Sequence, residues 1–287
     1  MKFYNTKEIK SKNITEYIIN IDALTAYDFK RRPGRKRRDF EELTSIEKAE
    51  SMQRRKAYYL DKRFDIKRII DCNFDDRSTF LTLTFKENIQ DIERANCEFT
   101  LFIKRLKRYL KNQQLKYIAT WELQERGAIH YHLVLFSVPY IDNKKLGELW
   151  ANGFIKINKI KETVKNEAVG VYITKYFVKD LDKKVKQKKA YFCSRNLIKP
   201  KETKKKLDFN EMNDILTNEE DLLYIKNFTA RELLEIDTIT GEKIYREVKK
   251  VYVVQKNKEL DLQIQKNVLN LKSIDTRQKE LSANNSK

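Results

Sequence analysis

The two histidines of this chain, His130 and His132, are separated by a single residue. They lie in residues 128–136 (AIHYHLVLF), an apolar stretch that is typical of a β-strand. Side chains of a strand return to the same face at every second residue, so both imidazoles must leave one face of a sheet. Two neutral imidazoles side by side on a rigid surface can bind a metal ion. The alternative is that they are ordinary half-buried polar residues of a sheet.

A second group of reactive side chains lies in residues 171–179 (VYITKYFVK). On a helix, Tyr172 and Tyr176 are one turn apart, so both hydroxyls project from one face. A phenol has a pKa of about 10 and is a weak nucleophile unless a cation or a metal-polarised target assists it. Lys175 flanks the same edge and would favour the phenolate while neutralising a phosphate. The alternative is an amphipathic helix whose tyrosines pack on a sheet.

The turn before the histidine strand decides which side chains join the two histidines. A three-residue loop at 126–128 places Glu122 opposite His132 and Gln124 opposite His130, all on one face. A two-residue loop would reverse this parity and bring a tryptophan beside the histidines while exporting the carboxylate. We favour the first register, because it keeps the polar side chains together.

In that register the site would hold two imidazoles and one or two side-chain oxygens, with positions left for water and a phosphate oxygen. Mixed nitrogen and oxygen ligands suit Mn²⁺ or Mg²⁺, and Zn²⁺ fits less well because thiolates are lacking. The metal would polarise a phosphoryl group as a Lewis acid.

The elements that must position these groups follow one another in a recognisable order. Strand patterns alternate with helical patterns in the sequence β-α-β-β-α-β, at residues 79–85, 89–110, 116–122, 128–136, 144–150 and 154–160. This order predicts an α+β fold of the ferredoxin-like kind, with an antiparallel sheet, helices on one face and the other face open for a ligand. A further helix is expected at residues 166–180, where the tyrosines lie.

The flanking segments carry weaker patterns. We expect a basic N-terminal extension at residues 1–70, a central domain at 71–205, and a C-terminal region at 206–287 whose role the sequence does not indicate. Within that last region, residues 232–254 suggest a hairpin around Thr240 and Gly241, and the last ten residues should be disordered.

The net charge points to a polyanionic partner. The 287 residues contain 61 Lys and Arg against 42 Asp and Glu, a net charge of +19, which favours nucleic acid. A basic run broken by a proline and a glycine is interpreted as an arm that is either simply solvated or contacts phosphates. Besides Lys179 and Arg126, the residues expected to contact DNA are those of this arm: Arg31, Arg32, Arg35, Lys36, Arg37 and Arg38.

Other features limit the range of functions. Three widely spaced cysteines make neither a disulfide framework nor a zinc site, which fits a reducing cytosol. The sequence shows no signal peptide and no apolar run long enough to cross a membrane, so we expect a cytoplasmic, soluble protein without a membrane partner. No phosphate-binding glycine loop occurs, so the chain should lack a helicase motor of its own.

Three ordered motifs give the chain a resemblance to the HUH endonucleases, the rolling-circle replication initiators of phages, plasmids and single-stranded DNA viruses. The first is the strand at 80–85 (FLTLTF). The second is His130-Tyr-His132, preceded by Glu122, and the third is the tyrosine segment at 172–179 (YITKYFVK), which resembles the two-tyrosine form of phage-type initiators. Residues 194–197 (SRNL) and Pro200 resemble the downstream end of this domain. The resemblance covers about residues 75–200.

The resemblance implies a mechanism and partners. A tyrosine attacks a phosphodiester of single-stranded origin DNA, becomes linked to the 5′-phosphate, and releases a 3′-hydroxyl for a host polymerase. Tyr172 is expected to act first, with Tyr176 acting at termination and Lys175 assisting. The ends are later rejoined without ATP, and a host helicase would open the duplex.

Two rival interpretations remain open at this stage. The first is a relaxase or an HUH transposase with the same cut-and-join chemistry. The second is a non-catalytic ferredoxin-like module that binds nucleic acid through exposed aromatic residues of its sheet. Metal-dependent covalent attachment to an oligonucleotide would separate the enzymes from the binding module.

Overall fold

The computed structural model describes residues 3–26, 40–111, 114–158, 169–180, 184, 190–236 and 243–257. The chain divides into two compact units. One unit consists of residues 1–31 together with 201–287, and the other consists of residues 32–200. This division differs from the predicted boundaries at residues 70 and 205, because the first strands of the chain pair with strands of the C-terminal region.

The unit of residues 32–200 contains a five-stranded antiparallel sheet in the order β8-β5-β7-β6-β9. Its strands are β5 (Thr79–Phe85), β6 (Lys116–Leu123), β7 (Ile129–Phe136), β8 (Gly153–Asn158) and β9 (Tyr191–Cys193). The first four strands have the order of a ferredoxin-like sheet, so the predicted fold class is confirmed. The short strand β9 extends the sheet at the free edge of β6.

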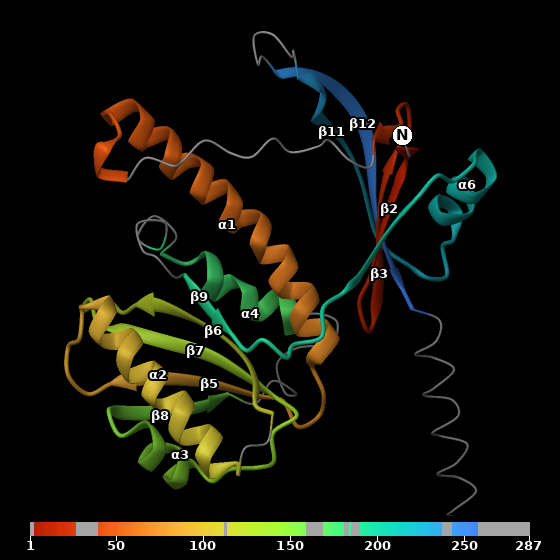
Figure 1. Ribbon diagram of the computed structural model, residues 1–287. Coiled ribbons are helices and arrows are strands. Elements are labelled where there is room, and N and C mark those ends of the chain that lie inside the picture. The colour runs from red at the N-terminus through yellow and green to blue at the C-terminus, as the bar shows by residue number, and fades with distance from the viewer. Residues whose placement is uncertain are drawn as a thin grey trace, which may run out of the picture. The chain divides into compact units, whose positions relative to one another are not determined.

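Helices α2 (Ile92–Tyr109) and α3 (Asn143–Trp150) cover one face of this sheet (Figure 1). Each begins at an aspartate, Asp91 or Asp142, whose side chain accepts hydrogen bonds from two backbone amides of the first turn. The alternate apolar residues of the strands pack against aromatic and aliphatic residues of both helices, among them Phe99, Phe102 and Trp150. This layer is the main hydrophobic core.

The opposite face is covered in part by α1 (Ser45–Asn73) and α4 (Val169–Val178) (Figure 1). Ile66 and Ile70 at the end of α1 and Phe177 of α4 pack on apolar residues of the sheet, which are Phe80, Ile118, Val134 and Phe136. The expectation that this whole face stays open is therefore wrong at its apolar end. The polar end carries the histidines.

The long helix α1 was not predicted, because few of its residues are buried. Thr44 and Glu47 form a reciprocal capping box at its start, which fixes where the helix begins. Only Ile66, Ile70 and Asn73 are buried, all in its last turns. The sequence of α1 therefore lacks the continuous apolar stripe by which an amphipathic helix is recognised.

The unit of residues 1–31 and 201–287 is built on a second antiparallel sheet, in the order β10-β2-β3-β12-β11. Its strands are β2 (Thr6–Lys10), β3 (Ile14–Asn20), β10 (Lys201–Lys205), β11 (Leu222–Ile236) and β12 (Lys243–Lys256), and α6 (Phe209–Thr217) packs on it. The short strands β1 (Phe3–Tyr4) and β4 (Thr25–Ala26) pair separately. The predicted hairpin at 232–254 is present and begins ten residues earlier, at Leu222; its predicted turn lies outside the described residues.

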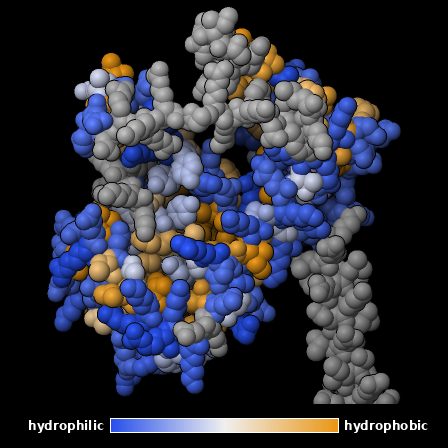
Figure 2. Space-filling view, in the orientation of Figure 1, coloured by the Kyte–Doolittle hydropathy of each residue, from blue (hydrophilic) through white to orange (hydrophobic). Residues whose placement is uncertain are grey.

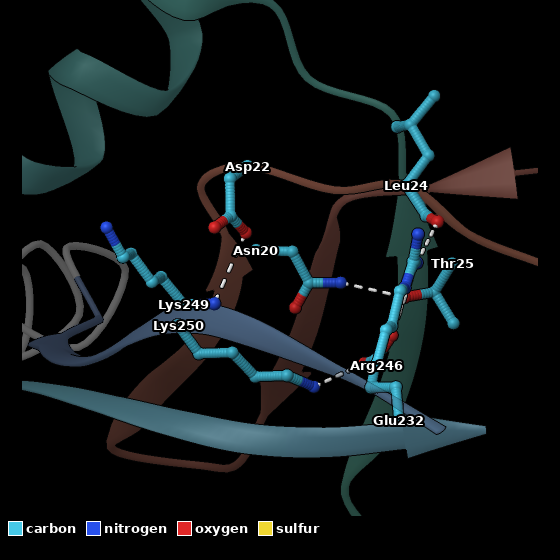
Figure 3. Close-up of polar contacts among 8 residues, drawn as sticks. All are labelled: Asn20, Asp22, Leu24, Thr25, Glu232, Arg246, Lys249 and Lys250. Atoms are coloured by element: carbon cyan, nitrogen blue, oxygen red, sulfur yellow. Dashed lines mark hydrogen bonds and ion pairs between the residues drawn. The ribbon is translucent and has the colours of Figure 1, made fainter. Parts of the chain in front are cut away.

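A polar cluster ties the loop after β3 to the β11–β12 hairpin (Figure 3). Glu232 contacts Lys250 at 2.5 Å and accepts a hydrogen bond from the Thr25 hydroxyl at 2.7 Å, and Arg246 Nη2 lies 3.6 Å from it. Arg246 also donates to the carbonyl of Leu24. Burial alone would raise the pKa of Glu232, but these contacts lower it below its ordinary value.

We expect Glu232→Gln to lower the free energy of unfolding by about 1–3 kcal/mol at neutral pH, because Lys250 loses its counter-charge in a mostly buried position. The pKa of Glu232 is lower in the folded state, so its stabilisation exists above the ordinary pKa and is lost as the pH falls through the lowered one. Urea denaturation of both chains at several pH values measures this difference. Glu247→Gln, at an exposed position on the same hairpin, is the matched control.

The surface agrees with the highly charged composition. Figure 2 shows hydrophilic residues over most of the visible face, with hydrophobic residues in small separate patches. Among the helices that the structure describes, none is both long enough and apolar enough to span a membrane.

Candidate functional site

The candidate site lies at the polar end of the sheet face that also carries α1 and α4. Two rows of paired residues cross the sheet there. Thr84 of β5 pairs with His130 of β7, which pairs with Glu122 of β6. In the next row on the same face, His132 pairs with Thr82 on one side and with Thr120 on the other. The predicted common face of both histidines and Glu122 is therefore present.

The predicted register is wrong by two residues, although its parity is right. Glu122 lies opposite His130, and the backbone amide of Gln124 closes the turn by donating to the carbonyl of Ala128 at 2.9 Å. The three-residue loop is thus 125–127 and not 126–128. Gly127 ends this loop at φ +84°, a conformation that residues with a Cβ rarely adopt. A shift of two residues preserves the face, which is why the site survives the error.

Glu122 connects His132 to α4. Its Oε1 lies 2.9 Å from His132 Nε2, and its Oε2 lies 2.9 Å from Lys179 Nζ. The geometry at His132 Nε2 and Glu122 Oε2 does not favour hydrogen bonds, so we treat these as ionic contacts. Burial raises the pKa of Glu122, but His132 and Lys179 more than offset this and lower the pKa to about 2. The carboxylate is charged at neutral pH.

His130 is buried and uncharged. Burial, together with the positive charge on its neighbour His132, lowers the pKa of His130 to about 4. Its Nε2 has no hydrogen-bond partner among the described residues, which is uncommon for a buried polar atom. A neutral imidazole with a free nitrogen is the form that binds a metal ion.

In kind, this donor set fits a divalent cation: two imidazoles on one strand and a charged carboxylate on the next. The fit is incomplete in arrangement, because no group of three or more His, Cys, Asp or Glu side chains within the described residues converges as a metal site. Glu122 faces His132 and Lys179, as described above. Thr82 Oγ1 lies 3.3 Å from His132 Nδ1 and orients that ring from the other side.

The helix α4 brings a tyrosine to the histidine pair. The ring of Tyr176 stacks on the ring of His132 with 3.9 Å between centroids and 24° between planes. Lys175 Nζ lies 4.8 Å from the centroid of the Tyr176 ring. Tyr172 lies one turn earlier in α4, and its side chain is outside the described residues.

Other predicted site residues are placed elsewhere. The side chain of Gln124 accepts a hydrogen bond from Arg126 Nε at 2.9 Å, so it faces the turn and not the histidines. Arg126 also donates to the carbonyl of Phe85 at 2.8 Å and thereby ties the turn to β5. The basic arm lies outside the described residues: Arg31, Arg32, Arg35, Lys36, Arg37 and Arg38.

Two residues that fix the end of α4 were not predicted. Asp180 accepts a hydrogen bond from the amide of Leu123 at 2.9 Å, beside Glu122. Lys184 is fully buried, donates to the carbonyl of Tyr176 at 2.7 Å, and lies 5.6 Å from the centroid of the Trp121 ring. In the sequence Lys184 belongs to a lysine-rich segment, which gave no sign that one ammonium is internal.

The fold and the site together define the class of domain: a ferredoxin-like sheet with two histidines on one strand and a tyrosine helix beside them. Residues 78–181 match the family described as replication-associated protein ORF2. The match begins at β5 and ends directly after α4, so it contains the histidine strand and the tyrosine helix. It confirms the resemblance to replication proteins for this part of the chain. Comparison with curated proteins and with solved structures gives no match.

We expect Lys184 to give the stability an unusual pH dependence. Burial lowers its pKa to about 7, although Asp180 and Glu122 favour the charged form and Lys179 opposes it. The unfolded chain therefore binds more protons between the lowered and the ordinary pKa, and stability rises with pH across that window. Relative to Lys184→Met, the wild type should gain about 3 kcal/mol between neutral pH and pH of about 10.

Urea denaturation at a series of pH values measures this gain. Lys144→Met, at an exposed position of α3, is the control and should show no such trend. Parallel stability curves for wild type and Lys184→Met would contradict the buried, deprotonating lysine.

Proposed function

We propose that this protein initiates rolling-circle replication by nicking single-stranded origin DNA through tyrosine attack. The stacking of Tyr176 on His132 carries this proposal, because it joins the predicted nucleophile segment to the predicted ligand segment. The match of residues 78–181 to a replication-associated family supports it independently.

The chemistry is a transesterification. A tyrosine oxygen bonds to phosphorus as the bond to O3′ breaks, so the phenol loses a proton and the departing O3′ becomes a hydroxyl. The DNA 5′ end remains attached as a phosphotyrosine, and the reverse reaction rejoins strands without ATP. We assign the first attack to Tyr172, which together with Lys175 matches the one-tyrosine pattern, and the later attack to Tyr176.

The basic residues of α4 stabilise charge during this step. Lys175, next to the Tyr176 ring, favours the phenolate and the developing negative charge on the phosphate. Lys179 holds Glu122 ionised and oriented. Asp180 and Lys184 anchor the helix end, so the tyrosine backbone stays in register with β6.

The residues that would hold a divalent cation are His130, His132 and Glu122. Mn²⁺ or Mg²⁺ bound there would supply Lewis-acid polarisation of the scissile phosphate. His130 contributes an uncharged imidazole with an unpartnered nitrogen, and Glu122 contributes a charged carboxylate. Because Gln124 bonds to Arg126, we leave it out of the ligand set.

This function requires further partners. Polyanion binding fits the net charge of +19, and a host helicase and a DNA polymerase would open the duplex and extend the free 3′-hydroxyl. A relaxase or an HUH transposase would use the same site, and the DNA that is cleaved would distinguish them. A non-catalytic nucleic-acid-binding module would form no covalent adduct.

Replacement of the tyrosine hydroxyls tests the mechanism. Phe retains the ring, so the stacking of residue 176 on His132 should persist while the nucleophile is lost. We expect Tyr172→Phe to lose most initial cleavage and Tyr176→Phe to impair mainly strand transfer. The double variant should form no adduct with single-stranded DNA of the encoding replicon, as measured by denaturing electrophoresis with Mn²⁺. Peptide mapping of a phosphotyrosine at any other position would refute the assignment.

Removal of the histidines tests the metal site by a readout other than cleavage. The chain with His130→Ala and His132→Ala should lose Mn²⁺ binding in isothermal titration calorimetry and also lose cleavage. Gln124→Ala, a variant in the adjacent turn, should keep both. Cooperative thermal unfolding of the double variant without metal shows that the fold is retained. Undiminished Mn²⁺ binding by that variant would place the metal elsewhere.

A further inference from the structure

The edge strand β8 continues the two rows of the candidate site. Phe154 pairs with Thr84, which pairs with His130, so these three residues share one face. Lys156 pairs with Thr82 in the row of His132. The face that carries the histidines therefore ends, at the β8 edge, in a phenyl ring and an ammonium group.

Both side chains are open to solvent. Phe154 is 72% exposed, and Lys156 is also exposed. By contrast, Ile155 and Ile157, which alternate with them, pack on the main core at the opposite face. The phenyl ring of Phe154 thus does not help to build the core, although full burial of such a ring would stabilise a fold by about 2 kcal/mol.

The backbone holds these two residues in place. Gly153, directly before Phe154, has φ +152°, and a Cβ there would lie 2.3 Å from the carbonyl oxygen of Thr84. Only glycine allows β8 to approach β5 this closely. This close contact fixes the backbone from which the Phe154 ring projects.

An exposed aromatic ring next to a lysine is the combination that binds single-stranded nucleic acid. A ring stacks on any base, and an ammonium contacts the adjacent phosphate. The two residues stand on the same face as His130 and His132, one strand away from β5. A strand of DNA held over the histidines would have this edge as its next support.

We infer that Phe154 and Lys156 form a DNA-binding subsite that stacks one base of the single strand and contacts its phosphate next to the scissile position. This subsite rests on the proposed function for its ligand, and it adds a positioning role that the catalytic residues do not supply. Phe154 supplies the stacking and Lys156 supplies the charge.

These two contributions are separable by measurement. Binding of a fluorescein-labelled oligodeoxythymidylate is followed by anisotropy over a range of salt concentrations, with EDTA present and in the chain that carries Tyr172→Phe and Tyr176→Phe. Phe154→Leu should weaken binding about tenfold without changing the salt dependence, and Phe154→Trp should retain it. Lys156→Ala should flatten the slope of log affinity against log salt by about 0.7.

Helix α2 provides matched controls on the opposite face of the sheet. Tyr109 is 44% exposed and Lys107 is exposed as well. Tyr109→Leu and Lys107→Ala should leave affinity and salt slope unchanged. Equal losses from these controls, or unchanged binding by Phe154→Leu, would overturn the subsite.

A scan with single abasic positions identifies the stacked base. At one position, removal of the base should weaken binding by the chain with Phe154 but not by Phe154→Leu, because both changes delete the same contact. Additive losses at every position would overturn the inference. Since all these measurements precede chemistry, a protein that binds in this way but forms no adduct would refute only the proposed nicking.

Discussion

Every polar side chain of the site depends on the two-residue period of the β6–β7 hairpin. Glu122, His130 and His132 share a face only because the loop at 125–127 has an odd number of residues, and Gly127 at its end supplies the positive φ that this loop needs. Addition or loss of one residue would send the carboxylate into the main core and a tryptophan to the surface. Arg126 and Gln124 hold the turn in that register, which explains why they do not reach the histidines.

Polarity changes along a single face of the sheet, and this change positions the site. At one end, Phe80, Val134 and Phe136 bury the last turns of α1 and the residue Phe177 of α4. At the other end the same strands carry threonines and histidines, so the apolar contacts that fix α4 also carry Tyr176 to His132. Burial next to the apolar end keeps His130 neutral, and Lys179 keeps Glu122 charged despite its burial.

The sequence alone allowed the ferredoxin-like order and the common face of the histidines to be predicted, because both follow from local periodicity. The register of the hairpin could not be predicted to the residue, since two positions of the same loop length keep the same parity. Helix α1 escaped prediction because its contacts are confined to Ile66, Ile70 and Asn73. Strands β2 and β3 were missed because the strands that flank them, β10 and β12, lie about two hundred residues away. Lys184 resembled its solvated neighbours in the sequence.

The pairing of β3 with β12 has a consequence for synthesis on the ribosome. Residues 32–200 contain all strands of their own sheet, so this unit can fold as soon as it has emerged. Strands β2 and β3 emerge first but have both outer edges unpaired until β10 and β12 follow. Unpaired edges attract other chains, and the nascent protein carries this hazard throughout the translation of the inserted unit. A pause or a truncation before Lys256 would therefore release a folded replication domain attached to an adhesive, incomplete sheet.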